Sequence, residues 1–215
     1  MPQSQALLTL NAGSSSLKFA LFETDRADRR LFSGAVERIG LETSSFRMSD
    51  TTGAPIVAST APVRNHEQAL AQVLAKIDGL AANFPLAAVG HRVAHGGPHC
   101  DCPARVTPAL MARLEGLHLP ANIAGIKAVG AARPDLPQIA CFDTAFHKDL
   151  PEVAQMTGLP RHFDAPEIRR YGYHGLSYEY IVSALRTAAV DVENERILVL
   201  HLGNGASICA ISGGK

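Results

Sequence analysis

The feature that most constrains the fold of this chain is a pattern that occurs twice. The segment LTLNAGSSSLKFALF begins at Leu8, and the segment LVLHLGNGASICAIS begins at Leu198. When they are superimposed, identical residues fall at Leu8/Leu198, Leu10/Leu200, Gly13/Gly203 and Ala20/Ala210. Each segment has two apolar, β-prone runs around a polar turn that contains glycine, which predicts a β-hairpin. We therefore expect a duplicated fold whose second copy begins near residue 195.

This repeat places the expected domain boundary late in the chain. We expect residues 1–194 to form the first domain and residues 195–215 to form the first hairpin of a second one. So short a segment cannot complete a domain of similar size, so we expect the sequence to be truncated.

The pattern of apolar residues between the two hairpins predicts an α/β fold. Strands are expected at 31–38, 44–50, 54–59, 86–90 and 138–142, and helices at 65–80, 108–117, 121–132 and 177–189. Asn65 followed by Gln68 resembles a capping box at the start of the first helix. Several strands followed by alternating helices and strands predict a mixed sheet with helices packed on it.

Composition excludes several classes of function. Lys and Arg together number 20, as do Asp and Glu, so no net field attracts the chain to nucleic acid or to an anionic membrane. No apolar run approaches the roughly 20 residues that span a bilayer, and no signal-peptide pattern is present, so we expect a soluble, cytoplasmic protein. The spacing of the cysteines predicts free thiols at Cys100, Cys102, Cys141 and Cys209.

The two glycine-rich turns are candidate phosphate sites. The turn at 13–16 exposes backbone N–H groups and hydroxyls, and Lys18 follows two residues later. The turn at 201–205 occupies the corresponding place in the second copy. Either turn alone could be an ordinary surface turn with a nearby lysine. Two such turns from duplicated hairpins could hold a polyphosphate between them.

Other candidate groups stand at the ends of predicted elements. Arg92 precedes a Gly-Gly turn, where its planar fork of donors suits a carboxylate or a phosphate, or else a surface ion pair. Asp143 follows an apolar strand and could orient Mg²⁺ or cap a helix. His174 could donate to a phosphoryl group or pack in a loop with two tyrosines. The GxSxG, Walker A and protein-kinase signatures are absent, so a kinase would need another scaffold.

Taken in order, six segments resemble the motif set of the acetokinase family, which comprises acetate, propionate and butyrate kinases. They are NAGSSSLKF, GHRVAHGG, PAN, FDTAFH, RRYGYHGLS and HLGNGAS. The resemblance implies the ribonuclease H-like fold of actin, hexokinase and Hsp70 ATPase domains, a mixed sheet with helices on both faces, here with a truncated second copy. It further implies that ATP and Mg²⁺ bind between the two halves, that a phosphoryl group passes from ATP to acetate or propionate, and that the complete protein is a homodimer.

The resemblance also implies roles for individual residues. Asp143 and His174 correspond to catalytic residues, and Asn11 to a residue associated with Mg²⁺. The residues expected around the nucleotide phosphates are Ser14, Ser16, Lys18, His201, Leu202, Gly203, Asn204 and Gly205. The residues expected around the carboxylate substrate are Arg92, Ala94, His118 and Tyr173.

Some positions depart from the family pattern. Leu119 replaces an asparagine, Tyr173 a phenylalanine, and Tyr178 a histidine, while Ala94 stands where acetate-preferring relatives have valine. Because family members continue well past Lys215, we expect the 215-residue chain alone to have little kinase activity. Two alternatives stay open: a sugar kinase of the same superfamily, and a non-catalytic, actin-like nucleotide-binding module.

Overall fold

The computed structural model describes residues 4–26, 29–80, 83–163, 168–203 and 205–215. The chain divides into two compact units, the first made of residues 1–93 and 104–140 and the second of residues 94–103 and 141–215. Within the described residues, no helix is both long and apolar enough to cross a membrane. The boundary expected near residue 195 concerns the sequence repeat and stays a prediction.

The elements follow the predicted order with small shifts at their ends. The strands are β1 (Ala6–Ala12), β2 (Ser16–Glu23), β3 (Arg30–Glu37), β4 (Ser44–Ser49), β5 (Pro55–Ala61), β6 (Leu86–Val93), β7 (Ala104–Arg105), β8 (Gln138–Phe142), β9 (Arg196–His201) and β10 (Ser207–Ser212). The α-helices are α1 (His66–Leu80), α2 (Pro108–Glu115), α3 (Pro120–Ala132), α4 (Glu152–Gln155) and α5 (Gly175–Thr187). Short 3₁₀ turns lie at Gly97–His99, Ala145–His147 and Arg161–Phe163.

A mixed sheet organises the first unit, as the sequence predicted. Its strand order is β5-β4-β3-β2-β1-β6-β8-β7, and the strands from β1 to β5 pair antiparallel with one another in that order. Strand β6 instead pairs parallel to β1, with Leu10 beside His91. Parallel neighbours end at the same edge of a sheet, so the turn after β1 and the end of β6 lie at one edge. Ligands of α/β sheets collect at such an edge.

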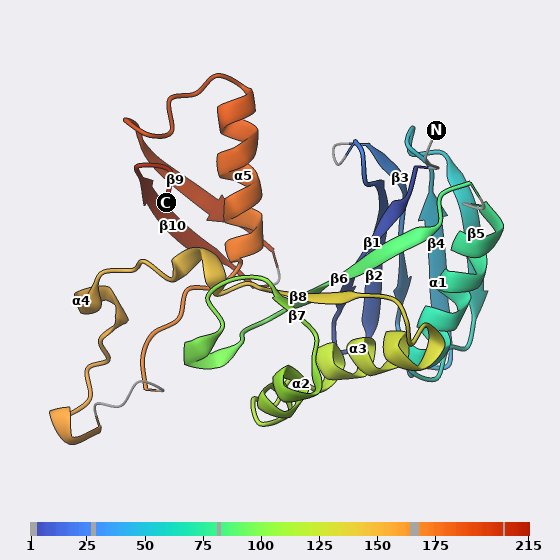
Figure 1. The fold of residues 1–215 in the computed structure, drawn as a ribbon, viewed down its shortest axis with the longest axis horizontal. Helices are drawn as coiled ribbons and strands as arrows, with labels where there is room; N and C mark the ends of the chain where they lie inside the picture. Colours follow the sequence, from blue (N-terminus) through green and yellow to red (C-terminus); the bar gives the residue numbers. More distant parts are fainter. Residues whose placement is uncertain (1–3, 27–28, 81–82, 164–167, 204) are drawn as a thin grey trace. The chain divides into compact units, whose positions relative to one another are not determined.

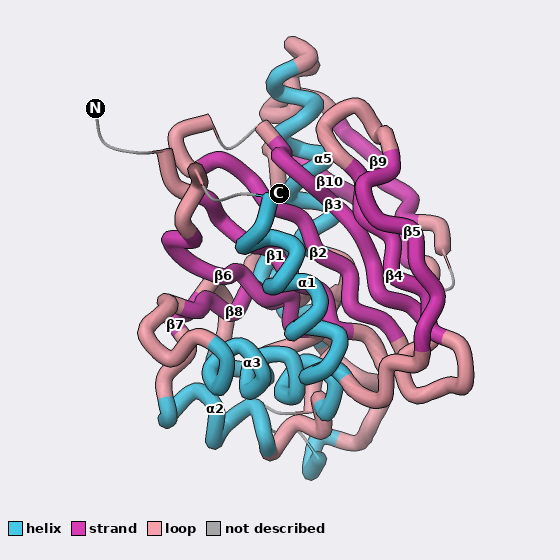
Figure 2. Tube along the Cα trace, turned by 90° about the vertical axis from the view of Figure 1, so that its right-hand side faces the viewer, coloured by secondary structure: helices cyan, strands magenta, loops and turns pink. Residues whose placement is uncertain are grey.

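Alternating side chains of the sheet and one face of each helix form the core of this unit. Helices α1 and α3 contact each other and cover one face of the sheet (Figure 2). On α1 the buried residues Leu70, Leu74 and Ile77 recur at helical spacing. The helix begins as predicted, because Asn65 Oδ1 accepts from the Gln68 N–H at 2.9 Å. The return bond to Gln68 Oε1 comes from the N–H of Arg64 at 2.8 Å, one residue earlier than in a standard capping box.

Both copies of the repeated pattern are antiparallel hairpins, as expected. In the first, Leu8 pairs with Leu21; in the second, Leu198 pairs with Ala210, which is a shift of one residue relative to the superimposed sequences. The second hairpin belongs to the second unit, where it packs with α5 (Figure 1). That small core contains Val182, Val192 and Ile211.

Helix α5 begins two residues before its predicted start. Its N-cap residue His174 has φ 60°, in the left-handed region, and the helix starts directly after it at Gly175. Apolar periodicity cannot reveal a turn of this kind. Strand β7 and helix α4 were not predicted, because each is too short to show a period.

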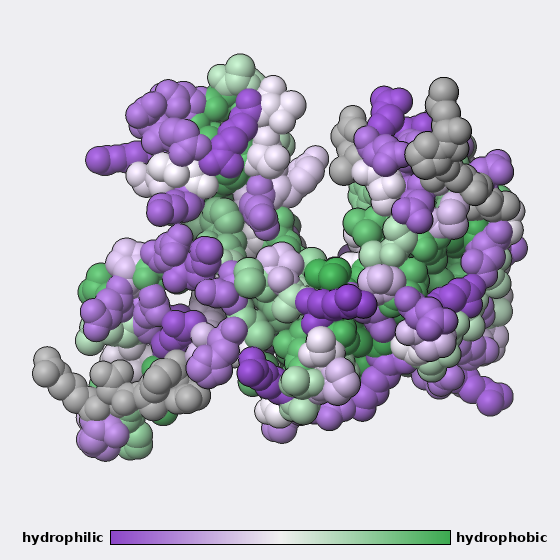
Figure 3. Space-filling view, in the orientation of Figure 1, coloured by the Kyte–Doolittle hydropathy of each residue, from purple (hydrophilic) through white to green (hydrophobic). Residues whose placement is uncertain are grey.

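The surface agrees with the balanced composition. On the face drawn in Figure 3, hydrophilic and hydrophobic residues are interspersed, and neither kind covers that face. The four cysteines are free thiols, as predicted.

Acid should destabilise the first unit through His91. Burial lowers the pKa of His91 from 6.5 to about 4, while its hydrogen bond to Gln138 Oε1, 2.8 Å long, acts in the opposite direction. Between these two pH values the unfolded chain binds a proton that the folded chain does not. The neutral, buried His91 therefore contributes its full stabilisation above pH 6.5. The free energy of unfolding falls by about 3 kcal/mol as the pH drops from there to about 4, the pKa of His91 in the folded chain.

The measurement is urea unfolding, followed by circular dichroism, across this pH range for the wild type and for His91→Gln. Other titrating groups are common to both proteins, so the difference between the two curves isolates His91. Parallel curves would contradict this prediction, because they would show that His91 has the same pKa in the folded and unfolded chains.

Candidate functional site

One cavity of the first unit, of about 490 Å³, lies where β1 and β6 end. Its polar lining comprises Ser14, His66, Arg92, His118 and Asn122. We call it the arginine cavity. It joins the first glycine-rich turn, the start of α1, the end of β6 and the segment from His118 into α3, so four segments far apart in the sequence contribute to it. Three of the residues predicted from the sequence, Ser14, Arg92 and His118, meet here.

Asn11 also belongs to this group, because Arg92 Nη1 donates to Asn11 Oδ1 at 3.3 Å. Asn11 pairs with Lys18 across the β1–β2 hairpin, and directly opposed residues of an antiparallel pair project from the same face. Lys18 is exposed. The hairpin therefore places an amide and a primary amine on one face next to the glycine-rich turn, and Ser16 begins the second strand.

Two side chains that the sequence analysis did not select hold this edge in place. His66, the first residue of α1, donates from Nε2 to the carbonyl of Gly13 at 2.7 Å. Asn122 of α3 donates from Nδ2 to the carbonyls of Ala12 at 3.0 Å and of Arg92 at 3.3 Å. Asn122 thereby ties the ends of β1 and β6 together. Asn122 is in the PAN segment of the family resemblance; His66 has no sequence signal.

Two candidate histidines have strained backbones. The non-glycine residues with positive φ in the described chain are Arg38, His118, His174 and Ala189. His118 has φ 54° and His174 has φ 60°. For a residue other than glycine this conformation costs on the order of 1–3 kcal/mol, and such strain clusters at functional sites. Half of this small set thus coincides with residues predicted for the site, His174 from its chemistry and His118 from the family resemblance.

The second unit contains a stacked pair of imidazoles, His174 and His201, which we call the histidine pair. Their ring centroids are 4.1 Å apart with an interplanar angle of 15°. Each ring approaches a serine hydroxyl: His174 Nδ1 lies 2.7 Å from Ser207 Oγ, and His201 Nδ1 lies 3.1 Å from Ser177 Oγ. A cavity of about 450 Å³ lies beside the pair.

The lining of this cavity includes Tyr173, His174, Gly205 and Ser207. It therefore brings the predicted residues Tyr173 and His174 together with Gly205, the last residue of the second glycine-rich turn. Leu202 and Gly203 of that turn are exposed, and Asn204 lies outside the described residues.

Asp143 is buried in the second unit, with 3% of its surface exposed. Its backbone carbonyl accepts from the N–H of Gly175 at 2.8 Å, which connects the end of β8 to the start of α5. Burial lowers the pKa of the neighbouring His147, as does the charge of His174, whereas its bond to the Tyr173 carbonyl and the charge of Asp143 raise it. Asp143 and His174 therefore both lie close enough to His147 to influence its ionisation.

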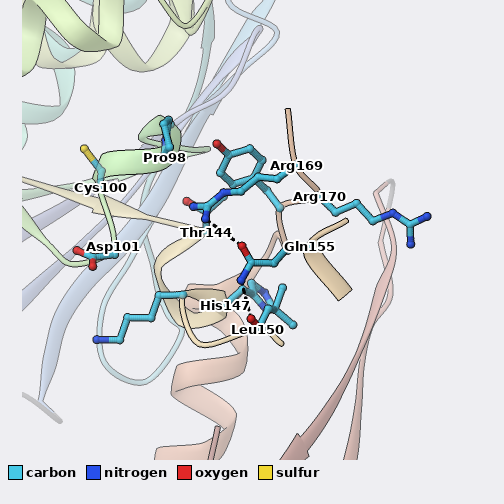
Figure 4. Close-up of a pocket in the computed structure, with 13 residues that line it drawn as sticks. Pro98, Cys100, Asp101, Thr144, His147, Leu150, Gln155, Arg169 and Arg170 are labelled. Carbon is cyan, nitrogen blue, oxygen red and sulfur yellow. Dashed lines mark hydrogen bonds between the residues drawn. The ribbon is translucent and has the colours of Figure 1, made fainter. Parts of the chain in front are cut away.

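A smaller cavity of the second unit, of about 20 Å³, is shown in Figure 4. Gln155 spans it, accepting from Arg169 Nη1 at 3.0 Å and donating to the carbonyl of Leu150 at 2.6 Å. The buried hydroxyl of Thr144 lines this cavity and has no partner in the described residues. The volume suits about one water molecule, which excludes a nucleotide.

The predicted site residues are thus divided between the two units. Asn11, Ser14, Ser16, Lys18, Arg92 and His118 belong to the first, and Ala94, Asp143, Tyr173, His174, His201, Leu202, Gly203 and Gly205 to the second. Ala94 is half-buried and follows the end of β6.

Within the described residues, no three His, Cys, Asp or Glu side chains are arranged to hold a metal ion. Asn11 Oδ1 accepts from the guanidinium of Arg92, and one amide oxygen so engaged falls short of the carboxylates and phosphates that Mg²⁺ usually takes.

Comparison with known sequences gives one consistent family. The profile of the acetokinase family matches residues 6–215. The acetate kinase of Rhodopseudomonas palustris (strain ATCC BAA-98 / CGA009) is 44% identical over 219 residues, which cover 97% of this chain and 55% of that protein. The acetate kinase of Streptomyces coelicolor is 42% identical over 226 residues, covering 99% of this chain and 54% of that protein. The chain spans about half the length of these curated relatives.

Solved structures agree. An acetate kinase from Porphyromonas gingivalis matches with a TM-score of 0.82 and 33% identity, over 98% of this chain and 56% of that one. A propionate kinase from Francisella tularensis matches with a TM-score of 0.86 and 30% identity, again over 98% of this chain and 56% of the other. The mixed α/β fold predicted from the sequence is the fold of these proteins.

Proposed function

This chain belongs to the acetokinase family, and we propose that the protein it represents transfers the γ-phosphoryl group of ATP to acetate or propionate. One carboxylate oxygen attacks the γ-phosphorus while the bond to the bridging oxygen of ADP breaks, which yields ADP and an acyl phosphate. The relatives named acetate kinase and propionate kinase support this reaction.

The observation that carries the proposal is the arginine cavity. A short carboxylate needs a small polar pocket with a fixed cation, and Arg92 presents a planar fork of donors in such a pocket. The Arg92 guanidinium donates to Asn11 Oδ1, and Asn122 Nδ2 donates to the backbone carbonyl of Arg92. The side-chain bond to Asn11 restrains the fork before the substrate arrives, and the bond from Asn122 fixes the backbone that carries it, which lowers the entropic cost of binding.

The chemistry needs electrostatic help more than proton transfer. A carboxylate with a pKa near ~4 to 5 is already ionised at neutral pH, so no general base has to create the nucleophile. The difficulty is that an anion must approach an anionic phosphoryl group. We propose that Arg92 holds the carboxylate, that Lys18 offsets phosphate charge, and that His174 donates a hydrogen bond to the transferring group.

We assign Asp143 a positioning role, although the family resemblance marks it as a catalytic acid or base. The residue is buried, and its backbone carbonyl accepts from the N–H of Gly175 at the start of α5. Asp143 is therefore placed to hold the adjacent His174 in position. Ser14, Ser16 and the turn at 201–205 are proposed to face the nucleotide phosphates. Mg²⁺, when bound with the nucleotide, would neutralise phosphate charge. Mg²⁺ binding and a homodimer both stay predictions from the family resemblance.

An acyl hydroxamate assay tests this function. Hydroxylamine traps an acyl phosphate as a coloured hydroxamate, so the protein as its organism makes it should give ATP-dependent colour with acetate or propionate. A sugar kinase would release ADP with a sugar and give no hydroxamate, and a non-catalytic nucleotide-binding module would do neither. Either of these results would overturn the proposal.

Acyl specificity should depend on Ala94. If Ala94 contacts the acyl group, alanine leaves more apolar room than the valine of acetate-preferring relatives, and one methylene in such a pocket is worth about 1–3 kcal/mol. Propionate should then be used as well as acetate or better, and Ala94→Val should move the preference toward acetate. Tyr173 adds a hydroxyl to the second unit's cavity and could oppose this trend.

The measurement is kcat/KM for acetate, propionate and butyrate. Ala61→Val, on the exposed strand β5, makes the same change away from the site and serves as the control. Equal acetate-to-propionate ratios in the wild type and in Ala94→Val would show that Ala94 does not shape the acyl pocket.

A further inference from the structure

His174 is the first member of a chain of three side chains that come from different parts of the second unit. Its Nδ1 lies 2.7 Å from the hydroxyl oxygen of Ser207 in β10. The same oxygen is hydrogen-bonded to the hydroxyl of Tyr178 in α5. Tyr178 stands where the family has histidine, so this contact belongs to the present sequence.

The direction of these two bonds follows from the supply of protons. A serine hydroxyl has one proton to donate, and its oxygen can accept from two partners. Tyr178 is buried, with 1% of its surface exposed, and a buried hydroxyl proton without an acceptor is costly. Among the described residues, the hydroxyl of Tyr178 has its hydrogen-bond partner in Ser207. Both hydroxyl protons find an acceptor only if Tyr178 donates to Ser207 Oγ and Ser207 in turn donates to His174 Nδ1.

This direction leaves the imidazole proton on Nε2. When Nδ1 of a neutral histidine accepts a hydrogen bond, Nε2 carries the hydrogen and is a donor. A Cβ atom added to Gly205 would lie 3.8 Å from both Cε1 and Nε2 of His174, so Nε2 lies on the side of the ring that faces the second glycine-rich turn. That turn is a proposed phosphate site.

The stacked partner supports a neutral ring. The centroids of His174 and His201 are 4.1 Å apart, and two like charges at this distance would repel each other. His201 has its own hydroxyl partner, because its Nδ1 lies 3.1 Å from Ser177 Oγ. The two rings thus share one pattern, a serine hydroxyl at Nδ1.

We propose that Ser207 and Tyr178 are positioning residues that hold His174 as the neutral tautomer with its proton on Nε2, aimed at the second glycine-rich turn. The identity of the recipient, a transferring phosphoryl group, rests on the function proposed above. A donor fixed in this way needs no reorientation when negative charge develops on the phosphoryl oxygens. Tyr178 thereby places a phenol hydroxyl against Ser207 at the position where the family has a histidine.

The first test reads the tautomer directly and needs no activity. Long-range ¹H–¹⁵N spectra of the histidine-labelled, 215-residue chain, at a pH above the ordinary histidine pKa, should show His174 protonated at Nε2. Ser207→Ala should shift His174 toward the other tautomer, Tyr178→Phe should weaken the preference, and Ser207→Thr, which keeps the hydroxyl, should retain it.

The matched control is Ser177→Ala, which removes the hydroxyl beside the other ring of the pair. It should change the His201 signals and leave the His174 tautomer as it is. The positioning role would be overturned by a His174 that carries its proton on Nδ1 in the wild type, or by an unchanged tautomer in Ser207→Ala.

A kinetic test separates this inference from the proposed function. In the protein as its organism makes it, Ser207→Ala should lower kcat by about 10- to 100-fold, by analogy with the loss of a hydrogen-bond partner of a metal-bound histidine, with KM for ATP unchanged. A tautomer shift without a change in kcat would show that His174 takes no part in the transfer, while the positioning contact stands.

Discussion

Replacing Arg92 with alanine is expected to lower kcat/KM for the carboxylate substrate by about 30- to 1,000-fold, which corresponds to about 2–4 kcal/mol of transition-state stabilisation. The loss is this large because a charge-assisted, two-pronged contact disappears from a cavity in which the neighbouring groups, His118 and Asn122, cannot supply a second fork of donors. The effect should fall on the carboxylate, so KM for ATP should change little.

Two further variants define the result. Arg92→Lys keeps the charge without the planar fork and should recover only part of the activity. Arg105→Ala removes an exposed arginine of β7 and should leave the kinetics as in the wild type. Because Arg92 also bonds Asn11, thermal unfolding must be compared before the rates are interpreted. An unchanged kcat/KM in a folded Arg92→Ala protein would remove this residue from the substrate site.

The second large effect is expected from Gly175→Ala. A Cβ atom at this position would lie 2.2 Å from the carbonyl oxygen of Asp143 and 2.8 Å from Cβ of Phe146. The first neighbour is backbone and cannot rotate away, so the end of β8 or the start of α5 must shift. We expect a loss of about 3 kcal/mol or more in the stability of the second unit. Activity should fall as well, because Asp143 and His174 flank the strained contact.

The four tyrosines of the chain give a probe for this unit alone. Tyr171, Tyr173, Tyr178 and Tyr180 all belong to the second unit, and the sequence contains no tryptophan. Urea unfolding followed by tyrosine fluorescence therefore reports the second unit without interference from the first. The control is Gly79→Ala in α1, where nothing lies within 4 Å of the added atom. That change should stabilise the first unit by about 0.5–1 kcal/mol, and an equal fluorescence midpoint for Gly175→Ala and the wild type would refute the predicted clash.

Most elements of the fold could be predicted because their signals are local. The alternation of β1 and β2 around Gly13, the helical spacing of α1 and the Asn65 cap depend on residues that are neighbours in the sequence. Where a local signal was missing, prediction failed in a specific way. The start of α5 was placed too late because a left-handed histidine, which no apolar period reveals, precedes it.

The sequence predicted the candidate site residues whose own chemistry or family resemblance points to a ligand. It did not predict the residues that only hold them in place. Arg92 and Ser14 were selected because their side chains suit anions, His118 was selected through the family resemblance, and all three line one cavity. His66 was not selected, because an isolated histidine at a helix start has no distinctive signal. Ser207 was not selected either, since a serine in a strand becomes informative only when its partners, His174 and Tyr178, are known.

The sequence by itself thus determined the hairpins, the helices and the residue types that can bind anions, since periodicity and side-chain chemistry are properties of short segments. Tertiary structure alone decided which of these groups meet. The bond from His66 to Gly13 spans 53 residues, and the bond from Asn122 to Ala12 spans 110. Such contacts arise because parallel pairing of β1 with β6, and packing of α1 and α3 on the sheet, bring distant segments to one edge. No short window of sequence contains that information.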